Sequence, residues 1–202
     1  SKIETVLILG WSRKVTQVLT ELLSYQQKRL SIDVVDTTPV DERELLVDSV
    51  SSGQLPATVR HVEKNFLNPD VLSEIHPGEY DAVLMIARER LEGEAIADAA
   101  TLSTYLTVDT LLTGSEAPHI VAEVLDDENE VLFDGDHGDA IVSPMVISYI
   151  LSQVALKREL GLIFQELTQS WGTTILFRSL EPGIGKDDCR FSELAAQAAA
   201  RG

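Results

Sequence analysis

The sequence predicts a doubly wound α/β fold, in which helices cover both faces of a parallel sheet. The first observation is a run of five β-favouring residues, 5–9, of which the last four are apolar; it ends in Gly10 and passes directly into an amphipathic segment. A strand with consecutive apolar residues needs cover on both faces, as in parallel sheets. The second observation is that strand and helix patterns alternate along the chain, with about six strands, which is the doubly wound pattern.

The expected elements follow from periodicity, caps and breakers. Strand patterns occur at residues 5–9, 31–36, 59–64, 81–87, 119–125 and 140–142. Helical patterns lie between them at about residues 12–29, 39–50, 69–75 and 93–112. Asn68 and Pro69 predict one helix start, and the sequence His76-Pro77-Gly78 predicts its end.

The turn after the first strand is the first place to look for function. Ligands of such sheets bind beyond the carboxyl ends of the strands, where the first strand meets its helix. The usual phosphate-binding fingerprint has three glycines, but here Gly10 is followed by Trp11, Ser12 and Arg13. Ser12 replaces the glycine that lets the backbone approach a pyrophosphate, which argues against a standard dinucleotide pose. The sequence therefore predicts a Rossmann-like sheet without its pyrophosphate turn.

Side chains around this turn leave alternatives open. Ser12 is expected to be the N-cap of the first helix. Arg13 and Lys14 are at the positive end of that helix, where they either face an anion or carboxylate or are solvated. Asp36 ends the second strand, where an acid either bonds ribose hydroxyls or serves as a turn residue before the next helix. Arg88 follows another buried strand at the same edge. We therefore predict ligand contacts at Gly10, Trp11, Ser12, Arg13, Asp36 and Arg88.

Composition limits the function classes. The chain of 202 residues has 33 acidic and 16 basic groups and a net charge of −17, which disfavours nucleic acid because phosphates are repelled. The single cysteine, Cys189, excludes an internal disulfide and a multi-cysteine zinc site. The longest uncharged stretch, residues 140–156, falls short of the roughly 20 apolar residues of a membrane span, so we expect a soluble chain. Common hydrolase, metalloprotease and nucleotide-triphosphatase motifs are absent from the sequence, and we predict no enzyme activity.

The helix that begins at Pro144 is apolar almost all round. Its apolar residues are Met145, Val146, Ile147, Ile150, Leu151, Val154, Ala155 and Leu156. Such a helix must be covered on both sides, either by another subunit or domain or by the chain's own C-terminal part. We expect three parts: residues 1–143, a helix pair at 144–172, and a partial α+β lobe at 173–202. Because the last helix has no following strand, we expect a longer polypeptide.

Several segments together resemble an RCK domain (regulator of potassium conductance), and most of all the second RCK module of CASTOR/POLLUX-class ion channels. The matching segments are Ile8-Leu9-Gly10-Trp11-Ser12-Arg13, Ala82-Val83-Leu84-Met85-Ile86-Ala87, Ile96-Ala97-Asp98-Ala99, Ala122-Glu123-Val124-Leu125-Asp126, Val142-Ser143-Pro144-Met145-Val146-Ile147-Ser148 and Phe191-Ser192-Glu193-Leu194. The resemblance covers nearly the whole chain.

The resemblance implies a regulatory gating-ring module on the cytoplasmic side of the cell membrane, coupled to a potassium or cation pore outside this chain. It also implies a homo-oligomer that pairs through a crossover helix, with contacts at Pro144, Ile147, Ile150, Leu151 and Val154. The alternatives are a peripheral nucleotide-binding subunit of a potassium uptake transporter and a free-standing NAD(P)-binding oxidoreductase. The missing glycines disfavour the oxidoreductase.

The ligand is left open between Ca²⁺ and a nucleotide. In calcium-gated relatives of this family, two acids alternate along the end of the fifth strand. Here Glu123 matches the first acid, but Leu125 stands at the second position. Asp126, Asp127 and Glu128 are the candidate replacements, and a solvated acidic turn is the competing interpretation. The predicted metal ligands are therefore Glu123 and Asp126.

Overall fold

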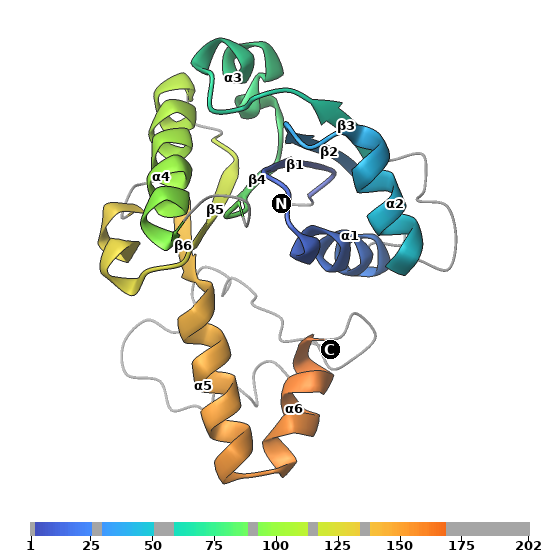
Figure 1. Cartoon of the computed structure of the whole chain (residues 1–202), viewed down its shortest axis with the longest axis vertical. Coiled ribbons are helices and arrows are strands. Elements are labelled where there is room, and N and C mark those ends of the chain that lie inside the picture. Colours follow the sequence, from blue (N-terminus) through green and yellow to red (C-terminus); the bar gives the residue numbers. More distant parts are fainter. Residues whose placement is uncertain are drawn as a thin grey trace, which may run out of the picture.

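The computed structural model describes residues 3–25, 30–50, 59–88, 93–112, 117–133 and 138–168. Its centre is a six-stranded sheet in the order β3-β2-β1-β4-β5-β6, and every neighbouring pair is parallel (Figure 1). The strands are β1 (Thr5–Leu9), β2 (Ser31–Asp36), β3 (Val59–Glu63), β4 (Ala82–Met85), β5 (His119–Val124) and β6 (Gly138–Val142). The Rossmann-like parallel sheet predicted from the sequence is confirmed.

Helices cover both faces of this sheet. Helices α1 (Arg13–Tyr25) and α2 (Val40–Val50) pack on one face, and α3 (Pro69–Ile75) and α4 (Glu94–Leu111) on the other. Because side chains alternate along a strand, Ile8 belongs to the core under α1 and α2, whereas Leu9 belongs to the core under α3 and α4. The four apolar residues of β1, Val6 to Leu9, are therefore buried on both sides, as their composition predicts.

Strand order reverses at β1, which pairs with β2 on one side and β4 on the other. The connections leave in opposite directions from this point, so the carboxyl ends of β1, β2 and β4 are where a doubly wound sheet binds its ligands. Every ligand contact predicted from the sequence is at or next to these three ends.

Local signals explain the shortest α-helix. The Asn68 side chain accepts a hydrogen bond from Asp70 N at 3.0 Å, and Pro69 occupies the first helical position. His76 ends the helix in the left-handed conformation, with φ of 56°, and its N–H donates to Leu72 O. Start and end are both where the sequence predicts them.

Some boundaries differ from the predictions. β4 ends at Met85 rather than at residue 87, and β6 begins at Gly138 rather than at residue 140. The acidic stretch after β5 forms a 3-10 helix, η2 (Asp127–Phe133), and another short one, η1 (Pro77–Glu79), follows α3. The helix expected to begin at Pro144 begins one residue earlier, at Ser143, because β6 runs straight into the helix and leaves Val142 in the cap position.

Helices α5 (Ser143–Leu156) and α6 (Glu159–Thr168) form a hairpin that projects from the end of β6 away from the sheet (Figure 1). None of the fourteen residues of α5 is buried. Gly161 of α6 faces Val154, whose Cγ1 would be 3.5 Å from a side chain at that glycine. The expected lobe at 173–202 and the last residues of the expected helix pair are outside the described residues. Within the described ranges, no helix combines the length and the apolar character that a membrane crossing requires.

Candidate functional site

Gly10 closes the turn between β1 and α1. Its φ is +103°, and a Cβ at this position would be 2.3 Å from the backbone oxygen of Ile86. Gly10 N donates to Val35 O at 3.0 Å, and Ile86 N donates to Leu9 O at 2.8 Å. The close approach that requires this glycine is therefore made by the chain's own backbone after β4.

Trp11 and Ser12 turn inward from this point. The Trp11 side chain is 6% exposed, and its ring meets the His61 ring edge-on with centroids 5.7 Å apart. Ser12 is buried, and its hydroxyl has no hydrogen-bond partner among the described residues. The predicted N-cap bond from its side chain is not formed, because the N–H of Val15 donates to the Ser12 backbone carbonyl at 3.0 Å. Neither side chain is presented to solvent, so their ligand contacts stay predictions.

The two basic residues at the start of α1 have different surroundings. Arg13 is exposed, whereas Lys14 Nζ is 2.5 Å from Glu123 Oε1. The other oxygen of Glu123 accepts a hydrogen bond from Ala87 N at 3.1 Å. A carboxylate thus offsets the unfavourable position of the lysine at the helix N-terminus. This pair ties α1 to the carboxyl ends of β4 and β5.

Asp36 and Arg88 are brought together across the end of β1. Asp36 is 1% exposed, and its Oδ1 accepts bonds from the N–H and the hydroxyl of Thr38, at 2.7 and 2.6 Å. Its Oδ2 has no hydrogen bond but is 3.5 Å from Arg88 Nε, an ion-pair distance. Arg88 Nη2 donates to Thr37 Oγ1 at 2.6 Å. Residues 89–92, which follow Arg88, are outside the described residues.

A buried arginine is the main feature that the sequence did not indicate. Arg43 is 0% exposed, and its Nη1 donates to Val34 O at 3.0 Å, while Nε and Nη2 have no partner among the described residues. Burial lowers the pKa of its guanidinium, against the opposing effect of Asp36 and Glu63. Arg43 Cζ is 6.0 Å from the centroid of the Trp11 ring. Its neighbours in α2 are acidic, a pattern typical of a solvated helix face, so no local signal could have found it.

His61 completes this buried group from β3. Neither of its ring nitrogens has a hydrogen-bond partner in the described part of the chain. Burial, together with the positive charge of Arg43, lowers the pKa of His61 to about 4. The ring is therefore neutral at neutral pH.

The predicted metal ligands, Glu123 and Asp126, form hydrogen bonds and ion pairs with other residues of the chain. Glu123 is paired with Lys14, whose positive charge opposes a cation at the same oxygen. Asp126 Oδ1 accepts a bond from Glu128 N at 3.0 Å, and Asp126 N donates to the buried carboxylate of Asp98 at 2.9 Å. Among the described residues, no group of three His, Cys, Asp or Glu side chains is placed to hold a metal ion. A calcium site at Glu123 and Asp126 stays a prediction that this geometry does not support.

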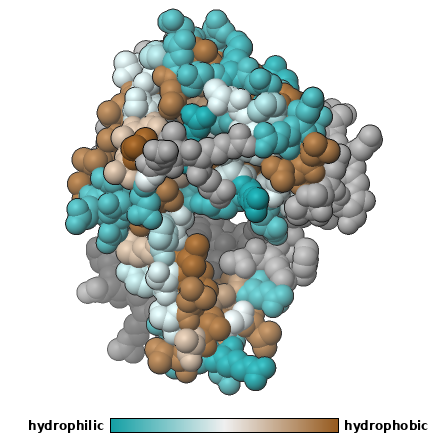
Figure 2. All heavy atoms as spheres, in the orientation of Figure 1, coloured by the Kyte–Doolittle hydropathy of each residue, from teal (hydrophilic) through white to brown (hydrophobic). Residues whose placement is uncertain are grey.

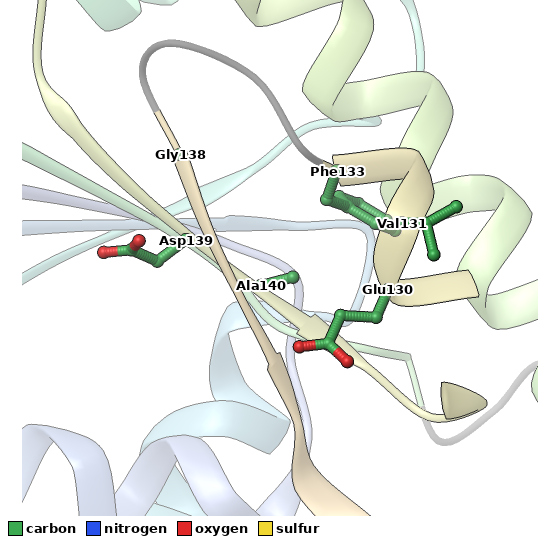
Figure 3. A pocket seen from close by; sticks show the side chains of 6 residues that line it. All are labelled: Glu130, Val131, Phe133, Gly138, Asp139 and Ala140. Carbon is green, nitrogen blue, oxygen red and sulfur yellow. The ribbon is translucent and has the colours of Figure 1, made fainter. Parts of the chain in front are cut away.

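A separate pocket of about 400 Å³ lies between η2 and the edge strand β6 (Figure 3). It is lined by Glu130, Val131, Phe133, Gly138, Asp139 and Ala140. The carboxylate of Asp139 points to the other side of the strand from Phe133, and it pairs with His119 Nε2 at 2.8 Å. None of the ligand contacts predicted from the sequence lines this pocket.

The predicted interface residues of α5 divide into two sets. Pro144, Ile147 and Leu151 are exposed, the last two at 56% and 64%. Ile150 and Val154 are half-buried, and Val154 faces α6. Figure 2 shows the apolar side chains gathered along α5 below the sheet domain. Their role in pairing stays a prediction.

No protein-family model matches this sequence. Among solved structures, the human SLO3 gating ring is similar at a TM-score of 0.48 and 16% sequence identity. The match covers 68% of this chain and 23% of that chain, so the matched part spans less than a quarter of the gating-ring chain. A likeness of this degree does not establish a family.

Proposed function

We propose that the chain is an RCK-type regulatory module of a potassium or cation channel, closest to the second module of the CASTOR/POLLUX class. In this proposal it has no enzyme activity, assembles with other copies through α5, and binds a small ligand at the carboxyl edge of its sheet. Ligand binding then biases a pore on another part of the protein, with the module on the cytoplasmic side of the membrane. The resemblance of the sequence segments and the character of α5 support it.

The observation that carries the proposal is the exposure of α5. Five of its large apolar side chains are in contact with water: Val146, Ile147, Tyr149, Leu151 and Leu156. Helix α6 adds Leu162, Ile163 and Leu167 to the same hairpin. Burying apolar surface gains roughly 25 cal/mol per Å², and patches of this kind mark association sites. A second copy of the same hairpin offers a complementary surface, as the crossover pairing requires.

The sheet edge supports a sensing role rather than a redox one. Ser12 stands where a dinucleotide enzyme has the glycine that lets the backbone approach the pyrophosphate. Asp36 retains the position that reads a ribose, and Glu123 is already neutralised by Lys14. A nucleotide therefore fits this edge better than Ca²⁺ does. A ligand can gate a pore only to the extent that it prefers one conformation of the assembly.

The test is the mass of the assembly in solution. Replacing Ile147 and Leu151 by Asp places charges on the exposed face of α5 without touching the α5–α6 contact at Val154. We expect wild type to be oligomeric in light scattering and the double variant to be monomeric with an unchanged circular dichroism spectrum. Leu45→Asp on α2 is the matched control, because Leu45 is 70% exposed and outside the proposed interface. A monomeric wild type, or a double variant of unchanged mass, would refute the proposed assembly.

A further inference from the structure

One oxygen at the carboxyl edge lacks the partner that its burial demands. Asp36 Oδ2 is buried without a hydrogen bond among the described residues, whereas Oδ1 of the same carboxylate accepts two. A buried acceptor without a hydrogen bond destabilises the fold, and more so when it is charged. The only positive group within ion-pair distance in the described ranges is the guanidinium of Arg88, at 3.5 Å.

Arg88 is held over this oxygen from three directions. Its Nη2 donates to Thr37 Oγ1, its Cζ is 5.6 Å from the centroid of the Phe66 ring, and its Nε faces Asp36. The backbone that carries it is also fixed, through Ile86 N to Leu9 O and Ala87 N to the Glu123 carboxylate. The Arg88 side chain is 19% exposed and that of Asp36 is 1% exposed, so the arginine is on the solvent side of the pair.

We infer that Arg88 is an internal gate on a ribose subsite at Asp36. Ribose hydroxyls and a guanidinium are both hydrogen-bond donors, and they compete for the same carboxylate oxygen. The subsite is closed while Arg88 covers Oδ2, and a nucleoside enters only when Arg88 moves away. The ion pair then lowers the apparent affinity by the fraction of molecules in which the gate is open. This inference rests on the proposed function, since it concerns the regulation of the same ligand site.

The test measures adenosine binding by calorimetry in wild type and in Arg88→Gln. Adenosine carries no phosphate, so a direct pairing of Arg88 with the ligand does not enter the comparison. We expect Arg88→Gln to bind adenosine about tenfold more tightly than wild type, because a charge-assisted contact of this kind shifts an equilibrium by about that factor. The gain should be absent with 2′,3′-dideoxyadenosine, which lacks both competing donors, and in the double variant Arg88→Gln/Asp36→Asn.

Two further variants make the result specific. Arg158→Gln removes the same charge from an exposed position beyond α5 and should leave adenosine affinity at the wild-type value. Thr37→Val removes only the hydrogen bond that holds Arg88 Nη2, so it should give a smaller gain in the same direction. If Arg88→Gln fails to fold, the adenosine affinity of Thr37→Val tests the inference in its place.

An adenosine affinity in folded Arg88→Gln or Thr37→Val that is equal to or weaker than in wild type overturns the gate. An equal gain for the dideoxy compound also overturns it, because the ribose would not be the group that Asp36 reads. Light scattering of the same samples separates the two claims. An oligomeric Arg88→Gln without an adenosine gain refutes the gate and leaves the assembly standing, whereas a monomeric wild type refutes the assembly whatever the calorimetry gives.

Discussion

Gly10 and Gly93 both have positive φ, at +103° and +95°, but their surroundings differ. A Cβ at Gly10 would meet Ile86 O at 2.3 Å, whereas a Cβ at Gly93 would meet nothing within 4 Å. Alanine at Gly93 is therefore destabilised by backbone strain alone, whereas alanine at Gly10 is destabilised by the same strain and by a clash with backbone atoms that cannot rotate away. Comparing the two variants therefore separates the effect of strain from the effect of the clash.

We expect Gly93→Ala to lower the free energy of unfolding by about 1–2 kcal/mol and Gly10→Ala to lower it by at least about 1 kcal/mol more. Urea denaturation of the two variants and wild type measures this difference. Equal losses would mean that the strands separate at Ile86 at little cost. A large loss at Gly10 also means that reduced ligand binding in a Gly10 variant reports damage to the turn, so Gly10 is a poor site for testing a ligand contact.

His61 gives the chain a pH dependence in a defined window. Its pKa falls from 6.5 to about 4 on folding, so the unfolded chain binds a proton in this range and the folded chain does not. The stability that depends on a neutral His61 is fully present above pH 6.5 and is lost as the pH falls toward 4. Because the ring is partly exposed, we expect a loss on the order of 1 kcal/mol, measured by urea denaturation at several pH values.

His61→Phe is the matched variant for this measurement. It keeps an aromatic ring beside Trp11 and Arg43 but removes the proton site. Its unfolding free energy should change less between pH 6.5 and 4 than that of wild type. Asp33 does not obscure the window: although burial raises its pKa, bonds from Arg60 and Tyr80 lower it on balance below 3.8, so its contribution is lost only in stronger acid. An unchanged pH slope in His61→Phe would assign the effect to other groups.

At the scale of elements, the sequence pattern predicted those features that depend on residues close together in the chain. The apolar strands, the Asn68 start and His76 end of α3, and the parallel pairing of the strands follow from composition and caps within a few residues. Helix η2 was not predicted, because its acidic sequence is typical of a solvated turn. Its start depends on Asp98 of α4, which accepts bonds from Leu125 N and Asp126 N across 27 and 28 residues.

In the candidate site, too, features set by position in the sequence could be predicted, and features set by distant residues could not. Position at the ends of β1, β2 and β4 was enough to select Gly10, Asp36 and Arg88, which the structure places at the same edge of the sheet. The partner of Lys14 could not be predicted, since Glu123 is 109 residues away in the sequence. Trp11 was selected for its place after the glycine, but which way its side chain turns depends on Arg43 and His61 in other elements. The periodicity of a sequence carries no information about contacts between residues that are far apart in it.

On the scale of the whole molecule, strong acidity and an exposed apolar hairpin oppose each other. Each copy carries a net charge of −17, so copies repel one another at long range. The hairpin of α5 and α6 offers mainly apolar surface, whose burial does not depend on charge. Assembly through it is therefore a balance of apolar attraction at the contact and electrostatic repulsion around it.

This balance predicts the direction of the salt effect on assembly. Raising NaCl from about 20 to about 300 mM shortens the screening length from roughly 20 to 6 Å, which removes repulsion between copies and leaves the apolar contact in place. We expect the association constant, measured by sedimentation, to rise several-fold over this range. Tetramethylammonium chloride at equal ionic strength should give the same rise, because screening does not depend on the identity of the cation; a rise with sodium alone would indicate a bound ion instead. Assembly that weakens with either salt would mean that ion pairs hold the copies together, and α5 would then not be the main contact.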